Sequence, residues 1–423
     1  SWKAKKSTWT SWKRSWTWWK ELESRTTASL KWKPRANLRI AVALPVLLTF
    51  LSCVSPRLVE TQPAYKVEDI PVVFIHGMLG SVLVDSSDEI QYLTAGEALG
   101  LRTPDLRLPT LWDGDKQPLD DLRPAGPLMR VGLIRHVIDQ AVYAPWIEFA
   151  SHIPGRPFYA FSYDWRRDGN ESADQFEKFI ETISKRHGKK VQIIAHSMGG
   201  IITLVVQNRR PDLIDRVVFA GVPFRGGLGY LDNLYLGTPI GANTNLLSPE
   251  VIFSHPGVYS FYPAGQSFEN KTLAEDESGK ALDIDFLDID AWQKNGFGPF
   301  APQNKSWGGE KHKAFLAGTL ARIRSFRKKM QPDKSKSYPR ALVITSDTYP
   351  TLARIRRIPP ASGESVPRWD FDSAAKGQGD GSVLRADAIP PEPIQSEVYL
   401  SKYGHSYLLN DPNAQDAIVK FLK

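Results

Sequence analysis

One ten-residue run, Val191-Gln-Ile-Ile-Ala-His-Ser-Met-Gly-Gly200, constrains the fold of this chain more than any other segment. Its apolar first half predicts a buried parallel strand, and Ile201–Val206 directly after it predicts a helix. The two glycines permit a sharp turn between them. A strand, turn and helix in this order lift the hydroxyl of Ser197 clear of the sheet and point backbone N–H groups toward the same space. The run therefore predicts an α/β fold that exposes Ser197 as a nucleophile.

A second loop upstream fits the same arrangement. Pro71–Gly80 predicts an apolar strand that ends in His-Gly-x-x-Gly. In a fold with a serine turn, such a loop supplies one backbone N–H to a developing oxyanion, and the residue after the serine supplies another. The predicted donors are the amides of Met78 and Met198. His76 and His196 flank the two loops, and we expect them to shape the pocket; an ordinary strand and loop with turn glycines is the alternative.

The partners of the serine follow in chain order. A serine hydroxyl needs an imidazole as general base, and the imidazole needs a carboxylate to orient it. His405 follows every candidate acid and precedes a predicted final helix. Asp380 lies in a glycine-rich loop and is the favoured acid, whereas Asp347 at the end of an apolar strand is the alternative. The order Ser197, Asp380, His405 is that of α/β-hydrolases, so we expect a mostly parallel sheet with helices on both faces and a large cap insertion.

Four motifs together resemble the lecithin:cholesterol acyltransferase family, which includes phospholipid:diacylglycerol acyltransferases and a lysosomal phospholipase A2. The resemblance extends from about Ile70 to the end of the chain. The motifs are the His-Gly-x-x-Gly loop at 76–80, Tyr163-Asp-Trp-Arg166, Ala195-His-Ser-Met-Gly199 and Gly379-Asp-Gly-Ser-Val383.

The resemblance implies chemistry on lipid acyl esters. By position it carries the catalytic triad onto Ser197, Asp380 and His405, and the oxyanion donor onto Met78. Trp165 is a further candidate pocket residue, although a structural role for the Asp-Trp-Arg string is favoured. Animal members of the family stabilise a lid with a disulfide near the oxyanion loop. This chain has a single cysteine and cannot form one within itself.

Composition separates the N-terminal part from the remainder. Residues 1–39 hold 11 Lys and Arg against 2 Asp and Glu, a net of +9, so the rest of a chain with net charge +8 carries −1. The basic pI therefore gives no reason to expect nucleic acid as a partner of the domain. This tryptophan-rich leader is expected to be disordered.

Apolar residues 40–54 are shorter than a spanning helix and resemble the core of a signal peptide. Phe-Leu-Ser before Cys53 resembles a bacterial lipoprotein box. The expectation is an exported, lipid-anchored protein with 55–68 as a tether; a signal anchor is the alternative.

Residues 69–423 are expected to form one α/β-hydrolase domain with insertions at about 83–130 and 224–340. The second insertion is rich in aromatic residues and predicts either a cap over the serine or a solvated bundle of loops. No metal and no cofactor are expected, and the expected partner is a lipid or ester substrate at a membrane surface. The predicted activity is hydrolysis of lipid acyl esters; transfer to a sterol or other lipid alcohol, and a binding protein without turnover, are the alternatives.

Overall fold

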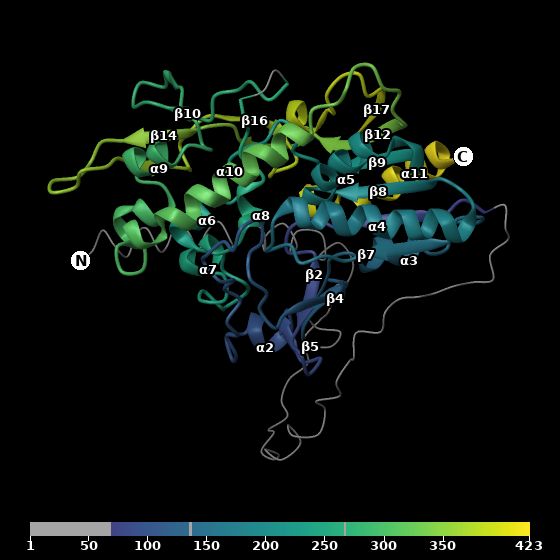
Figure 1. Cartoon of the computed structure of the whole chain (residues 1–423), viewed down its shortest axis with the longest axis horizontal. Helices are drawn as coiled ribbons and strands as arrows, with labels where there is room; N and C mark the ends of the chain where they lie inside the picture. The colour runs from purple at the N-terminus through teal and green to yellow at the C-terminus, as the bar shows by residue number, and fades with distance from the viewer. Residues whose placement is uncertain (1–68, 135–137, 266–267) are drawn as a thin grey trace, which may run out of the picture. The chain divides into compact units, whose positions relative to one another are not determined.

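A six-stranded parallel sheet forms the centre of the chain (Figure 1). The computed structural model describes residues 69–134, 138–265 and 268–423. The basic leader, the apolar segment, Cys53 and the tether lie outside them, so the expectations for these parts remain predictions. The strand order across the sheet is β17-β12-β9-β8-β1-β7. The strands are β1 (Val72–Ile75), β7 (Phe158–Phe161), β8 (Val191–His196), β9 (Ile214–Ala220), β12 (Arg340–Ser346) and β17 (Ser396–Ser401).

Both faces of the sheet are covered, which explains why its strands read as continuous apolar runs. Alternate side chains enter different cores: Val73 and Ile75 belong to one apolar cluster, and Val72 and Phe74 belong to the other. The first cluster includes side chains of two helices, one of which crosses the near face of the sheet in Figure 1. The expected α/β-hydrolase fold is confirmed. The covering helices are α4 (Gly169–His187) and α5 (Met198–Arg209) on one face, and α3 (Ala144–Ala150) and α11 (Pro412–Leu422) on the other.

The strand order brings the two predicted loops together. The chain passes from β1 outward to β7 and then returns to β8 on the other side of β1. Ligands of open α/β sheets bind at such a switch point, beyond the carboxyl ends of the strands. Ile75 pairs with Ala195 in register, so the loop after β1 and the turn after β8 leave the sheet side by side.

The segment predicted as the first insertion builds a small antiparallel sheet in the order β3-β2-β4. A hairpin of two further strands follows it, before the chain enters α3. These elements are β2 (Ser81–Val84), β3 (Ile90–Tyr92), α2 (Ala95–Ala98), β4 (Arg123–Pro127), β5 (Arg130–Ile134) and β6 (Ile138–Ala141).

The second predicted insertion contains mainly short helices and one long one, which gather to the left of the sheet in Figure 1. Its interior is aromatic: Tyr259, Tyr262, Trp292 and Phe297 are buried and contact one another ring to ring. It is therefore a packed layer and not a solvated bundle of loops. Its helices are α6 (Asn233–Leu236), α7 (Pro249–Phe253), α8 (Pro256–Tyr259), α9 (Ile289–Asn295) and α10 (Lys313–Lys329).

Short strands that precede and follow β12 in the sequence form two further small sheets. They form a four-stranded sheet in the order β11-β10-β14-β15 and a β13-β16 pair. Within the described ranges, we find no helix that is both long and apolar enough to span a bilayer. The strands are β10 (Ala274–Glu275), β11 (Ala281–Leu282), β13 (Tyr349–Leu352), β14 (Ile355–Ile358), β15 (Arg368–Asp370) and β16 (Lys376–Gly379).

Candidate active site

Ser197 lies on a strained turn between β8 and α5. Its backbone has φ 51° and ψ −122°, a conformation that residues other than glycine rarely adopt. The neighbouring strand β9 holds this turn, because Ser197 N–H donates to the carbonyl of Ala220, the last residue of β9, at 2.9 Å. Gly200 allows the helix to approach the sheet: a Cβ there would lie 2.1 Å from the side chain of Val222. The sharp turn predicted from the sequence therefore has a direct cause in packing.

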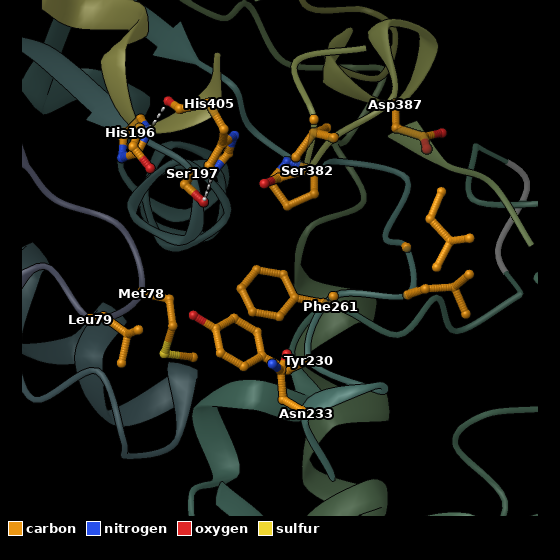
Figure 2. Close-up of a pocket in the computed structure, with 18 of the residues that line it drawn as sticks. Met78, Leu79, His196, Ser197, Tyr230, Asn233, Phe261, Ser382, Asp387 and His405 are labelled. Carbon is orange, nitrogen blue, oxygen red and sulfur yellow. Dashed lines mark hydrogen bonds between the residues drawn. The ribbon is translucent and has the colours of Figure 1, made fainter. Parts of the chain in front are cut away.

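The three predicted triad residues form one chain of hydrogen bonds, of which Figure 2 shows the bond between His405 and Ser197. His405 Nε2 lies 2.9 Å from Ser197 Oγ, and His405 Nδ1 lies 2.8 Å from Asp380 Oδ2. A carboxylate can only accept, so Nδ1 carries the proton and Nε2 offers its lone pair to the serine hydroxyl. This is the tautomer that a general base needs.

Asp380 is fixed by the loop in which it lies. Its Oδ1 accepts backbone N–H bonds from Ser382 at 2.9 Å and Val383 at 2.7 Å, while its Oδ2 faces His405. Burial alone would raise the pKa of Asp380. The adjacent imidazole and the two backbone donors outweigh burial, so the pKa falls below its usual range. The carboxylate is therefore ionised and orients His405 at neutral pH.

Asp347, the alternative acid, points elsewhere. Its carboxylate lies 3.2 Å from the guanidinium of Arg385 in a partly exposed ion pair. Although both aspartates follow strands of the same region, only Asp380 reaches His405.

Gly221 is a site residue that the sequence analysis missed. It follows β9 with φ 58°, and a Cβ at this position would lie 2.9 Å from both Asp380 Oδ2 and His405 Nδ1. Any larger residue would therefore intrude on the acid–base hydrogen bond. The available signal was a glycine directly after a core strand, within Phe-Ala-Gly-Val-Pro.

The loop after β1 is arranged to present a backbone donor. The Gly77 carbonyl accepts from His76 Nδ1–H at 2.8 Å and from the Gly80 N–H at 3.1 Å. In a planar trans peptide the N–H of the next residue points the opposite way. The Met78 N–H is therefore directed away from these bonds, and Met78 lines the cavity in front of Ser197. Met198 is the first residue of α5, so its N–H has no acceptor within the helix.

A cavity of about 480 Å³ opens in front of Ser197, within the size range of ligand sites. Figure 2 shows Met78 and Leu79 on one side and the rings of Tyr230 and Phe261 on the other. These two rings stack at a centroid separation of 5.8 Å. At the far end, the ammonium group of Lys271 pairs with the carboxylate of Asp387, which also lines the cavity. The cavity thus combines an apolar wall with one charged end.

Of the three predicted pocket residues, only His196 lines the cavity. His76 is buried against Tyr163, with the two ring centroids 4.4 Å apart in a stacked arrangement. The Tyr163 hydroxyl also donates to the backbone carbonyl of His76. Burial lowers the pKa of His76 to about 4, so its imidazole is neutral. Trp165 is also buried and supports the wall residue Tyr92 from behind, at a ring separation of 5.1 Å. His76 and Trp165 therefore lie outside the lining of this cavity.

The Asp-Trp-Arg string has the favoured structural role. The buried guanidinium of Arg166 pairs with Asp164 and Asp120, both at 2.7 Å. Its backbone carbonyl accepts from Gly257 of α8, and Trp165 Nε1 donates to the Ser81 carbonyl at 3.3 Å. The string therefore connects both inserted segments to the end of β7.

Comparisons with known proteins agree with these motifs. The model of the lecithin:cholesterol acyltransferase family matches residues 132–278. An uncharacterized protein of Saccharomyces cerevisiae, YJR098C, is 22% identical over 80% of this chain and 59% of its own length. Lecithin-cholesterol acyltransferase-like 4 of Arabidopsis thaliana is 35% identical over 19% of this chain and 17% of its own length. The chain thus spans less than two thirds of either relative.

A solved structure shares the fold over most of the chain. In the Tle4–Tli4 complex, the similar chain superposes with a TM-score of 0.58 at 14% identity, over 85% of this chain and 98% of that one. At this identity the likeness concerns the fold alone. The family model and the Arabidopsis relative bear out the resemblance to the lecithin:cholesterol acyltransferase family over the segments that they match.

Proposed function

We propose that this chain is a serine-dependent enzyme that cleaves acyl esters of lipids. The observation that carries the proposal is the hydrogen-bonded chain from Ser197 through His405 to Asp380, beside a largely apolar cavity that Ser197 and His405 line. The relationship to an acyltransferase family supports a lipid acyl ester as the substrate.

The first half of the reaction forms an acyl-enzyme. Ser197 Oγ attacks the ester carbonyl carbon while His405 Nε2 takes the hydroxyl proton. The carbonyl oxygen becomes an oxyanion that accepts from the amides of Met78 and Met198, a contribution that is commonly the largest in such reactions. The intermediate then collapses, the bond to the alcohol breaks, and His405 returns the proton to the leaving oxygen.

The second half of the reaction releases the acyl group. A water molecule or an alcohol attacks the acyl carbon, and His405 removes its proton as it did that of the serine. Water yields a free fatty acid, and an alcohol yields a new ester. Hydrolysis is the proposed activity, and transfer to a sterol or other lipid alcohol is the alternative that uses the same residues.

The decisive experiment has two arms. First, a fluorophosphonate probe should label the wild-type chain but not Ser197→Ala; a binding protein without turnover would show no labelling that depends on this serine. Second, mass spectrometry after incubation with mixed lipid vesicles and an added sterol should detect free fatty acid. If esterified sterol accumulates instead, the enzyme is a transferase. If neither product depends on Ser197, the proposal is wrong.

A further inference from the structure

One chain of hydrogen bonds connects the two loops of the site from behind. The Gly77 N–H lies 3.0 Å from Tyr143 Oη, which lies 2.7 Å from His196 Nδ1. On the other side of the ring, His196 Nε2 lies 3.0 Å from the backbone carbonyl oxygen of His405. These hydrogen bonds join four segments of the polypeptide: the loop after β1, the start of α3, the end of β8 and the loop after β17.

The direction of every bond follows from its ends. A carbonyl oxygen can only accept, so His196 Nε2–H donates to His405. A neutral ring then has a lone pair at Nδ1, and the Tyr143 hydroxyl donates to it. The same hydroxyl oxygen accepts from the Gly77 N–H, so each of the three donors has one suitable acceptor.

Burial keeps both side chains uncharged. It is the main reason that the pKa of His196 falls to about 3, with a further lowering from the nearby His405 ring. Burial likewise raises the pKa of the Tyr143 hydroxyl above its usual range. Neither group titrates in the range where a serine enzyme works, so neither competes with His405 as a base.

The two ends of this chain of hydrogen bonds lie next to the groups that react. Gly77 directly precedes Met78, the predicted oxyanion donor, which lines the cavity. His405 is held at its own N–H by the Asp380 carbonyl, at 2.9 Å, and at its carbonyl by His196. We propose that Tyr143 and His196 are positioning residues that hold the oxyanion loop and the general base in a fixed position relative to each other.

The His405 carbonyl sets the tautomer of His196, and the hydroxyl of Tyr143 complements that tautomer by donating to Nδ1. Without the hydroxyl, the Nδ1 lone pair is buried with no donor, and the ring loses one of its two anchors. The ring is then free to move, and the backbone of His405 that it holds would move with it relative to Ser197. The proposal rests on the proposed function, because it assigns these residues to the same ester chemistry.

Another tyrosine–histidine pair of this protein serves as a matched control. Tyr159 on β7 and His187 at the end of α4 are also buried and hydrogen-bonded, at 2.9 Å. Their rings have an interplanar angle of 76° and a centroid separation of 5.7 Å, against 76° and 5.6 Å for Tyr143 and His196. Tyr159→Phe therefore removes a similar hydroxyl at a comparable structural cost.

The kinetic test compares variants of the full chain on p-nitrophenyl butyrate. Tyr143→Phe and His196→Asn should each lower kcat about 10- to 100-fold with little change in KM, because each breaks a buried hydrogen bond. The amide of His196→Gln extends far enough to donate to the His405 carbonyl, and it should recover most of the kcat lost in His196→Asn. The double variant Tyr143→Phe/His196→Asn should be no worse than its poorer single variant. Tyr159→Phe should retain the wild-type kcat.

A second measurement keeps this inference separate from the proposed function. Side-chain ¹⁵N spectra of histidine-labelled protein should show His196 as the Nε2–H tautomer in wild type and in Tyr143→Phe, with the Nδ1 resonance displaced in the variant because it no longer accepts a hydrogen bond. An Nδ1–H tautomer in wild type, or equal kcat for the two His196 variants, would overturn the positioning role. Undiminished turnover by Ser197→Ala would instead overturn the proposed function, whatever the spectra show.

Discussion

Replacing Asp380 with Asn should reverse the proton arrangement of the triad without disturbing its geometry. Oδ1 of Asp380 accepts two backbone N–H bonds, and an amide NH₂ group cannot take that place because donor would face donor. The Asn oxygen therefore stays there, and its NH₂ group occupies the former Oδ2 position 2.8 Å from His405 Nδ1. The ring must accept at Nδ1 and carry its proton on Nε2, so it can no longer take the proton of Ser197.

The magnitude follows from losing the general base while the oxyanion donors remain. A wrong tautomer in a serine triad lowers kcat about 10⁴-fold, equivalent to about 5.4 kcal/mol of transition-state stabilisation. The assay is steady-state hydrolysis of a p-nitrophenyl ester, with circular dichroism to check folding. Asp347→Asn is the control, and it should retain wild-type kcat because Asp347 pairs with Arg385. A loss of less than about tenfold in Asp380→Asn, or a comparable loss in Asp347→Asn, would refute the assignment.

Three further predictions concern the same site. Ser197→Ala should lower ester turnover about 10⁴- to 10⁶-fold in a chain with an unchanged circular dichroism spectrum; retained turnover would identify another nucleophile. Gly221→Ala should lower kcat about 10²-fold, because its Cβ would lie 2.9 Å from both ends of the Asp380–His405 bond, and a crystal structure with that bond intact would contradict the reasoning. The lowered pKa of Asp380 means that its ionised form stabilises the fold above pH 3.8 and that this contribution is lost as the pH falls below it. In urea titrations, the difference in unfolding free energy between wild type and Asp380→Asn should therefore shrink below that pH; a constant difference would count against it.

The sequence predicted the parts of the site that are contiguous in the chain. The strand, turn and helix around Ser197 form one local unit, so their residues report the geometry directly. The choice between Asp380 and Asp347 was harder, because both follow strands and only the direction of the side chain separates them. Gly221 and Tyr143 were missed, since each matters through a neighbour distant in sequence. Tyr143 acts at the start of α3, but its partners lie after β1 and at the end of β8.

The second insertion shows the same distinction between composition and position. Its aromatic content left a cap and a solvated bundle of loops both open, and composition alone could not tell which residues fix its place. A buried pair does so: the Arg327 guanidinium on α10 lies 2.7 Å from the Glu269 carboxylate. Arg327 also donates to the carbonyls of Phe224 at 2.6 Å and Ser260 at 3.2 Å.

Such a pair contributes little net stability, because both charges lose their water, but leaving either one unpaired costs about 3–5 kcal/mol. It therefore acts chiefly by penalising every arrangement in which these segments separate. Phe224 and Ser260 each lie within two residues of cavity-lining positions, Gly226 and Phe261. With Cys53 as the single cysteine, no disulfide within the chain can tie these segments together. The buried arginine joins α10 to two adjacent segments of the cavity wall and so holds this part of the wall in place by electrostatic means.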